Sequence, residues 1–257
     1  MKQEERMKYL INYLLNENSQ YRKLPVPNDA FQQKQLLRSL MNVRLPKEIG
    51  EDFLQVQDEY LKEANNEKGI VDYKTLTPKE DGIYLWQGDI TSLKCGAIVN
   101  AANSGLTGCY VPCHTCIDNC IHTFAGIQLR NECAAIMKAQ GHEEETGTAK
   151  ITSAYNLPCD YVIHTVGPIV GDYVTKEDER LLESCYRSCL ELADRNNISG
   201  IAFCCISTGV FRFPNQRAAE IAVETVRNYK KETHSDIEVI FNVFKDKDYE
   251  IYSKLLR

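Results

Sequence analysis

The chain has 257 residues, a formal net charge of −6 and 43% hydrophobic residues. A chain of this length can bury one large core, or one core with a smaller neighbour. The acidic balance argues against nonspecific nucleic-acid binding, so we expect no nucleic-acid partner. No apolar run approaches the roughly 20 residues that a membrane-spanning helix needs, so we also expect no association with a membrane.

The first part of the chain is polar and has helical periodicity. Its opening residues, Met1-Lys-Gln-Glu-Glu-Arg6, are charged and lack the apolar region of a signal peptide, so we expect a cytoplasmic protein. Apolar residues at helical spacing predict one helix, a second begins after Asn28, and a third covers about 48–64. We therefore predict a helical N-terminal extension over residues 1–75, packed on a main domain over residues 76–257.

From about residue 80, short apolar runs alternate with amphipathic stretches. The pattern predicts strands at 83–86, 97–100, 147–152, 161–166, 200–206 and 237–243, and helices at 117–140, 177–195, 215–230 and 248–256. Such alternation indicates an α/β sheet covered by helices on both faces. Ligands bind beyond the carboxyl ends of the strands in these sheets, so the loops at 87–91, 100–118 and 207–214 are expected to meet there.

One loop concentrates residues that can bind a metal. It carries Cys109, Cys113, His114, Cys116 and Cys120. Thiolates and imidazoles are the usual ligands of zinc, in a catalytic site with three protein ligands or a structural site with four. The three cysteines at 109, 113 and 116 also have the spacing of an iron–sulfur loop. The other cysteines examined, Cys185, Cys189, Cys204 and Cys205, lie in apolar elements and are interpreted as buried small residues.

Three other positions have both a functional and a structural interpretation. Gly209 follows a buried strand and allows a phosphate to approach the backbone, although glycine is also common in strand-to-helix turns. Asp89 lies at a loop tip, where it binds a ligand or caps a turn. Asp118, near a helix start, acts on water or interacts with the helix dipole. His122 and His164 lie within apolar elements and are interpreted as structural.

Five ordered segments carry a family resemblance. They are Gln87-Gly-Asp-Ile-Thr91, Ala97-Ile-Val-Asn-Ala-Ala-Asn103, Ile151-Thr152, Val162-Ile-His-Thr-Val-Gly-Pro168 and Ser207-Thr-Gly-Val-Phe211. In this order they resemble a macrodomain, which implies a three-layer α/β/α fold with a central mixed sheet and a cleft for ADP-ribose. The segment Gly108–Cys116 replaces the glycine-rich loop of common macrodomain hydrolases. This replacement, together with the N-terminal extension, resembles the zinc-dependent macrodomains of bacteria and fungi.

The resemblance implies a role for each site residue. Asp89 and Ile90 would bind adenine, and Asn103 the distal ribose. The metal would be Zn²⁺, bound by Cys109, His114 and Cys116, with Asp118 positioning or activating water. The diphosphate would lie against the loop formed by Ser207, Thr208, Gly209, Val210 and Phe211.

The function that the resemblance implies is removal of mono-ADP-ribose from a protein side chain, expected to be an Asp or Glu ester. The partners are then ADP-ribose and the modified protein, with a functional link to a sirtuin-like ADP-ribosyl transferase. Two alternatives remain open from the sequence. One is a reader module that binds ADP-ribose without cleavage, and the other is a hydrolase of another derivative, such as O-acetyl-ADP-ribose.

Overall fold

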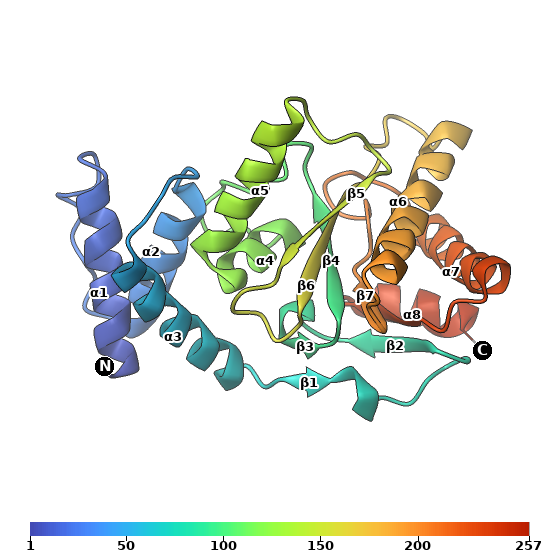
Figure 1. The fold of residues 1–257 in the computed structure, drawn as a ribbon, viewed down its shortest axis with the longest axis horizontal. Coiled ribbons are helices and arrows are strands. Elements are labelled where there is room, and N and C mark those ends of the chain that lie inside the picture. Colours follow the sequence, from blue (N-terminus) through green and yellow to red (C-terminus); the bar gives the residue numbers. More distant parts are fainter. Residues whose placement is uncertain (257) are drawn as a thin grey trace.

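The computed structural model describes residues 1–256 as a central sheet with helices on both sides and a group of helices at one end (Figure 1). The main-domain strands are β2 (Ile83–Gln87), β4 (Ala97–Ala102), β5 (Ala149–Ser153), β6 (Tyr161–Val166), β7 (Gly200–Phe203) and β8 (Glu238–Val243). The helices after β4 are α4 (Ile117–Ala125), α5 (Ile127–Gln140), α6 (Lys176–Arg195), α7 (Asn215–Thr233) and α8 (Asp246–Leu255).

The six strands form one mixed sheet in the order β2-β8-β7-β4-β6-β5. All neighbours are parallel except β5, which runs antiparallel to β6. A smaller parallel pair joins β1 (Val71–Asp72) to β3 (Leu93–Lys94). The carboxyl ends of the five parallel strands therefore share one edge of the sheet.

The register of the strands shows which helices share a face. Phe203 of β7 is paired with Phe241 of β8, so both side chains point to the same face. Tyr186 of α6 packs on Phe203, and Tyr252 of α8 packs on Phe241. Helices α6 and α8 therefore cover this face, with α7 between them in contact with both. Helices α4 and α5 cover the opposite face, which confirms the predicted three-layer arrangement.

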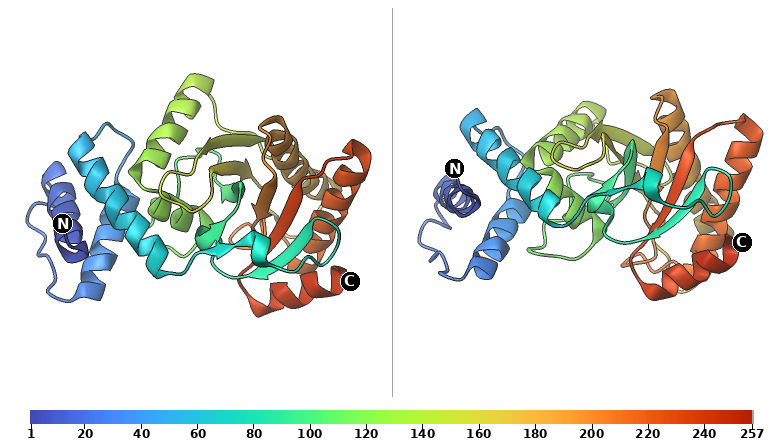
Figure 2. Two further views of the ribbon diagram at one scale, coloured as in Figure 1. Left: turned by 60° about the horizontal axis from the view of Figure 1, so that its bottom comes forward. Right: turned by 90° about the horizontal axis from the view of Figure 1, so that it is seen from below.

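The N-terminal segment forms three helices: α1 (Gln3–Glu17), α2 (Ala30–Val43) and α3 (Glu51–Glu67). Apolar side chains of these helices form a core of their own, which also takes in Ile127 of α5. In Figure 1 and both views of Figure 2 this group lies at one end of the molecule, beside the green helices α4 and α5. The predicted helical extension is therefore present and packs on the main domain, while the boundary at residue 75 stays a prediction.

Two predicted elements were wrong in extent. The single helix predicted over 117–140 is two helices, because Gly126 between them has φ of 104°, which is not a helical conformation. A Cβ at this position would lie 2.7 Å from Gln57 Nε2, so the close approach also favours glycine. The strand predicted over 200–206 ends at Phe203, and Cys204–Ile206 belong to the loop beyond the sheet edge. The other predicted elements agree to within about three residues at each end. Within residues 1–256 we find no helix with the length and apolar character needed to cross a membrane.

Candidate active site

The site is built where the parallel strands end. β4 leads into an irregular segment over residues 103–116, and helix α4 follows it directly. The loop after β7 leaves the same sheet edge, next to β4. The turn after β2 is the short helix η2 (Ile90–Ser92), which packs against α3 and α4. The three loops predicted to meet therefore lie along one edge.

Asp118 lies in the first turn of α4 and is bound by two amides. Asn100 Nδ2 donates to Asp118 Oδ1 at 2.8 Å, and Asn103 Nδ2 lies 3.3 Å from Asp118 Oδ2. Only 5% of Asp118 is exposed, and burial raises its pKa to about 6, although the Asn100 hydrogen bond and the Arg130 charge oppose the shift. Asp118 is therefore a fixed carboxylate with an elevated pKa beside Asn103.

Gly108 shapes the backbone between Asn103 and the cluster of Cys109, His114 and Cys116. Its φ is 84°, and a Cβ at this position would lie 2.8 Å from the ring of buried His122. The carbonyl oxygen of Gly108 accepts a hydrogen bond from Asn103 Nδ2 at 3.2 Å. Glycine is therefore required for both the backbone conformation and the close approach to His122.

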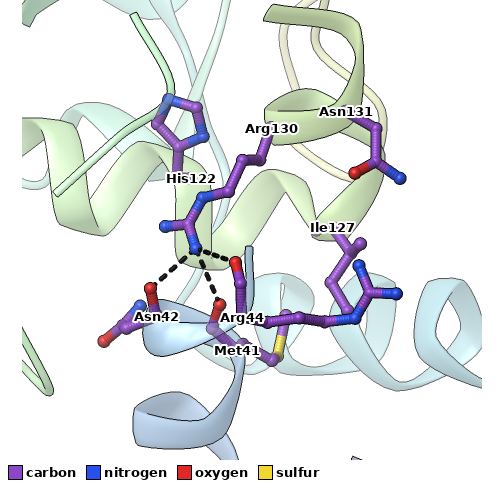
Figure 3. Close-up of a pocket in the computed structure, with 8 residues that line it drawn as sticks. Met41, Asn42, Arg44, His122, Ile127, Arg130 and Asn131 are labelled. Atoms are coloured by element: carbon purple, nitrogen blue, oxygen red, sulfur yellow. Dashed lines mark hydrogen bonds between the residues drawn. The ribbon is translucent and has the colours of Figure 1, made fainter. Parts of the chain in front are cut away.

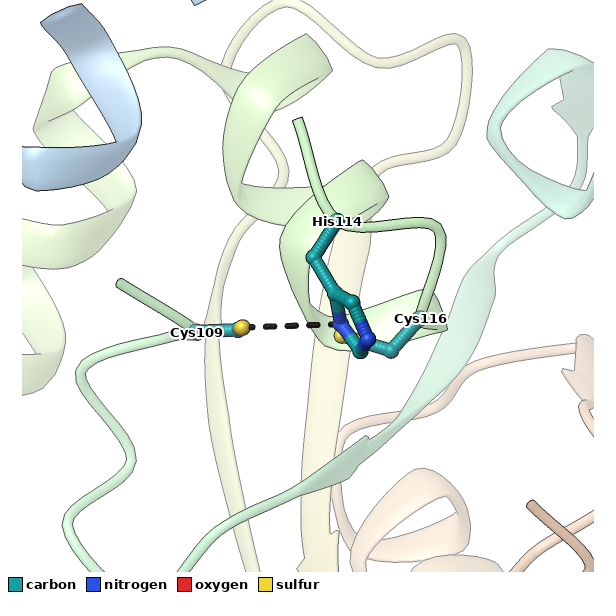
Figure 4. A group of neighbouring side chains, drawn as sticks. All are labelled: Cys109, His114 and Cys116. Carbon is teal, nitrogen blue, oxygen red and sulfur yellow. Dashed lines mark hydrogen bonds between the residues drawn. The ribbon is translucent and has the colours of Figure 1, made fainter. Parts of the chain in front are cut away.

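Cys109, His114 and Cys116 come together in space. Their donor atoms all lie within 4.8 Å of one another, and Cys109 Sγ is 3.7 Å from His114 Nδ1. Figure 4 shows these side chains converging from the irregular segment and the start of α4. A tetrahedral zinc ion with sulfur at about 2.3 Å and nitrogen at about 2.0 Å holds its donor atoms about 3.5–3.8 Å apart. The donor set and its spacing therefore fit zinc with three protein ligands.

The two remaining thiols of this region make other contacts. Cys113 Sγ lies 3.2 Å from Ser39 Oγ, and Cys120 Sγ lies 3.6 Å from Arg38 Nη2. Cys116 also caps α4, since the backbone N–H of Asn119 donates to its sulfur at 3.4 Å. Burial raises the pKa of Cys116 to about 12, so this thiol is neutral at pH 7 unless a cation stabilises its thiolate.

The loop predicted to bind diphosphate is open at its centre. A Cβ at Gly209 would have no heavy atom within 4 Å, and Val210 is 72% exposed. Ser207 is buried with φ of 63°, and its Oγ has no hydrogen-bond partner among the described residues. The left-handed conformation therefore falls on Ser207 rather than on Gly209. Thr208 Oγ1 bonds to the carbonyl of Cys205, while Phe211 is half-buried and its carbonyl accepts from Val170 N–H.

Asp89 occupies the cap position of η2. Its Oδ1 accepts from the backbone N–H and the hydroxyl of Thr91, at 3.0 and 2.7 Å. Its Oδ2 lies 3.3 Å from Lys68 Nζ at the end of α3. Asp89 therefore caps η2, as its structural interpretation predicted. Ile90 beside it is buried.

Comparison with known proteins decides the family. Residues 99–222 match the Macro domain family. The chain is 58% identical over 260 residues to a protein-ADP-ribose hydrolase of Treponema medium, covering 100% of both chains. The chain belongs to the macrodomain family.

Two further relatives bear on the site. A Trypanosoma brucei macrodomain solved in complex with ADP-ribose is 29% identical, with a TM-score of 0.67, and the match covers 86% of the present chain and 95% of the other chain. A probable bifunctional ADP-ribose hydrolase/ADP-ribosyltransferase of Fusarium oxysporum f. sp. cubense is 42% identical over 241 residues. That match covers 86% of the present chain and 40% of the fungal chain.

Several residues of this site were not identified from the sequence. Asn119, next to Asp118, donates from Nδ2 to the carbonyl oxygens of Cys109 and Val111, at 3.3 and 2.9 Å. Arg38 of α2 donates to the carbonyl oxygen of His114 at 2.7 Å. An asparagine in the first turn of α4 was a weak signal, and the sequence contains no pattern that connects Arg38 with a loop 76 residues away.

A second cluster lies deeper in the macrodomain. A donor atom of each of His122, Cys133 and His164 lies within 4.8 Å of the others, and these residues are all buried. His164 bonds to Thr152 Oγ1 at 3.0 Å, and burial lowers its pKa to about 3. Burial likewise lowers the pKa of His122. Both histidines are therefore neutral interior groups, in agreement with their structural interpretation.

Proposed function

We propose that this macrodomain hydrolyses the bond between ADP-ribose and a modified protein side chain. The relative that matches it over its full length carries the name protein-ADP-ribose hydrolase, and the Trypanosoma brucei structure contains ADP-ribose. The contact between Asn103 and Asp118 carries the assignment within the site, because it places an amide that can bind ribose beside a buried carboxylate.

The ligand would lie along the sheet edge. Asp89 and the Ile90 backbone would bind adenine beside α4. The backbone from Ser207 to Phe211 would bind the diphosphate, since the space above Gly209 is open and backbone N–H groups bind anions without a basic side chain. Asn103 would bind the distal ribose, whose C1″ atom carries the bond to be cleaved.

Cys109, His114 and Cys116 would hold a zinc ion at the distal-ribose end of this cleft. When bound, zinc supplies a Lewis acid. The carboxylate of Asp118 lies beside Asn103, with Oδ2 3.3 Å from Asn103 Nδ2, and would therefore face the distal ribose. There it orients a water molecule towards C1″ and accepts its proton, while Asn100 keeps the carboxylate in one orientation.

The modified side chain in this account is an aspartate or glutamate, joined to C1″ through an ester. A transferase that places ADP-ribose on such a side chain would supply the substrate. The Fusarium relative supports this link, because its name combines a hydrolase with an ADP-ribosyltransferase in one chain. The sirtuin-like character of that transferase rests on family resemblance.

The test is release of free ADP-ribose from proteins that carry one ADP-ribose on a carboxylate or on a serine. We expect rapid release from the carboxylate and much slower release from the serine. Tight binding of ADP-ribose without any release would contradict hydrolysis and favour a reader. Faster turnover of O-acetyl-ADP-ribose than of modified protein would contradict the assignment of modified protein as the substrate.

A further inference from the structure

The ligand loop, Cys109–Cys116, bears the three residues proposed to bind zinc. It is irregular throughout, and Cys113 within it has φ of 52°, a strained conformation for a residue with a Cβ. A loop of this kind has few internal hydrogen bonds to fix it. Contacts from other parts of the chain must therefore fix the backbone conformation of the ligand loop.

Helix α2 of the N-terminal extension supplies these contacts on both sides of His114. Asn42 Oδ1 accepts a hydrogen bond from the backbone N–H of Cys113 at 3.0 Å. Arg38 Nη2 donates to the backbone carbonyl oxygen of His114 at 2.7 Å. The backbone immediately before and immediately after the His114 side chain is thus bound by side chains of the same helix.

Asn119 extends this hold to the two cysteines. Arg38 Nη2 also donates to Asn119 Oδ1 at 2.9 Å, which orients the Asn119 amide. Asn119 Nδ2 then donates to the carbonyl oxygen of Cys109 at 3.3 Å, and its backbone N–H donates to Cys116 Sγ at 3.4 Å. Arg38 is therefore connected, directly or through one buried residue, to Cys109, His114 and Cys116.

The main domain in turn holds the end of α2. Arg130 of α5 is buried and donates from Nη1 to the carbonyl oxygens of Met41, Asn42 and Arg44, at 3.1, 2.6 and 2.7 Å (Figure 3). These carbonyls lie at the end of the helix, where they lack partners within it. Asn42 Nδ2 also donates to Thr123 of α4 at 2.9 Å. The cavity between α2 and α5 is only about 10 Å³, room for about one water molecule.

We propose that α2 is a structural part of the metal centre: Arg38 and Asn42 hold the ligand loop in the geometry that binds zinc. This inference rests on the zinc site of the proposed function. The N-terminal extension then fixes the geometry of the metal ligands, in addition to covering one end of the main domain. Arg38 and Asn42 are positioning residues, since both bind the backbone of the ligand loop and neither belongs to the Cys109, His114 and Cys116 cluster.

The test compares the zinc affinity of the full-length protein with that of Arg38→Ala, Arg38→Lys and Asn42→Ala variants. Affinity is measured by competition with a chromophoric chelator, and amide hydrogen exchange over residues 109–116 is followed in the same samples. Lys34→Ala is the matched control, because Lys34 is an exposed cation of the same helix whose ion pair is with Glu67 rather than with the ligand loop.

We expect Arg38→Ala and Asn42→Ala to weaken zinc binding about tenfold to a hundredfold, the usual effect of losing a residue that orients a metal ligand. Arg38→Lys should also weaken binding, because an ammonium group on a flexible stem lacks the fixed planar geometry with which Nη2 reaches both acceptors. The amide of Cys113 should exchange faster in Asn42→Ala, and Lys34→Ala should match the parent.

Parental zinc affinity in both alanine variants would overturn the inference, while zinc-dependent turnover by the parent would leave the proposed function intact. Zinc affinity that depends on Arg38 and Asn42, together with equal turnover by the parent with and without zinc, would leave the inference intact and contradict the proposed catalytic role of the metal. A parent that binds no zinc would overturn both. Arg38 is only half-buried, so its variants keep the test decisive if Asn42→Ala fails to fold.

Discussion

Asn100 and Asp118 are joined by a hydrogen bond of 2.8 Å between a fully buried amide and a buried carboxylate. The same Asn100 nitrogen lies 3.1 Å from His164 Nδ1. Because an amide nitrogen only donates, His164 Nδ1 accepts, and the proton of the neutral ring lies on Nε2, which faces Thr152 Oγ1. A chain of three buried side chains, Thr152, His164 and Asn100, thus fixes the orientation of Asp118.

Replacing Asp118 by Asn should remove proton transfer and keep the shape of the site. We expect turnover of carboxylate-linked ADP-ribose to fall about 10²–10⁴-fold, the usual contribution of a positioned acid or base. Binding of free ADP-ribose, measured by calorimetry, should change little. Asp52→Asn, an exposed change at the start of α3, is the control. Parental turnover by Asp118→Asn would show that this carboxylate is not used.

The thiols around α4 should divide into two classes. Cys109→Ser and Cys116→Ser should lose zinc, because their sulfur atoms belong to the three-residue cluster. Cys113→Ser and Cys120→Ser should keep one zinc per chain, because their sulfur atoms face Ser39 and Arg38 instead. Zinc content by mass spectrometry checks this division. Loss of zinc on changing Cys113 or Cys120 would indicate a four-ligand structural site.

Gly209→Ala should affect the ligand and not the fold. A methyl group at this position meets no protein atom within 4 Å, so the thermal unfolding temperature should stay the same. The added methyl would occupy the space proposed for the diphosphate, and ADP-ribose affinity should fall at least about tenfold, equivalent to about 1.4 kcal/mol. Unchanged affinity would show that the diphosphate lies elsewhere.

His164 should make the protein less stable in acid. Its pKa is about 3 in the folded protein, against the ordinary 6.5, so below pH 6.5 only the unfolded chain binds this proton. The free energy of unfolding should therefore decrease by up to about 1.4 kcal/mol for each pH unit from 6.5 towards 3. Urea unfolding in the presence of a chelator measures this slope. His164→Gln should have a shallower slope, and equal slopes would contradict the assignment.

The fold could be read largely from the sequence because hydrophobic periodicity is a local property. Strand Tyr161–Val166 and the start of α4 at Ile117 were predicted at their observed positions. Gly126 was missed as a break, since the apolar face of α4 continues into α5 and hides the change of direction. The end of β7 was missed for a similar reason, because Cys204 and Ile206 stay buried after the strand has ended.

The site could be predicted only where its residues are close in the chain. Cys109, His114, Cys116 and Asp118 lie within ten residues, and the family resemblance assigned them to one centre. Arg38 and Asn42 reach the same centre from a helix about 70 residues earlier, through contacts to backbone atoms. A contact to a backbone carbonyl or N–H requires no particular partner residue, so it leaves no pattern in the sequence.

The most direct test of the account measures ADP-ribose release from a carboxylate-modified protein by three samples of the same enzyme. These are the enzyme as purified, the enzyme stripped with a chelator, and the stripped enzyme with zinc restored. We predict release by the first and third samples and loss of release in the second. Equal release by all three would contradict a catalytic role for the Cys109, His114 and Cys116 cluster.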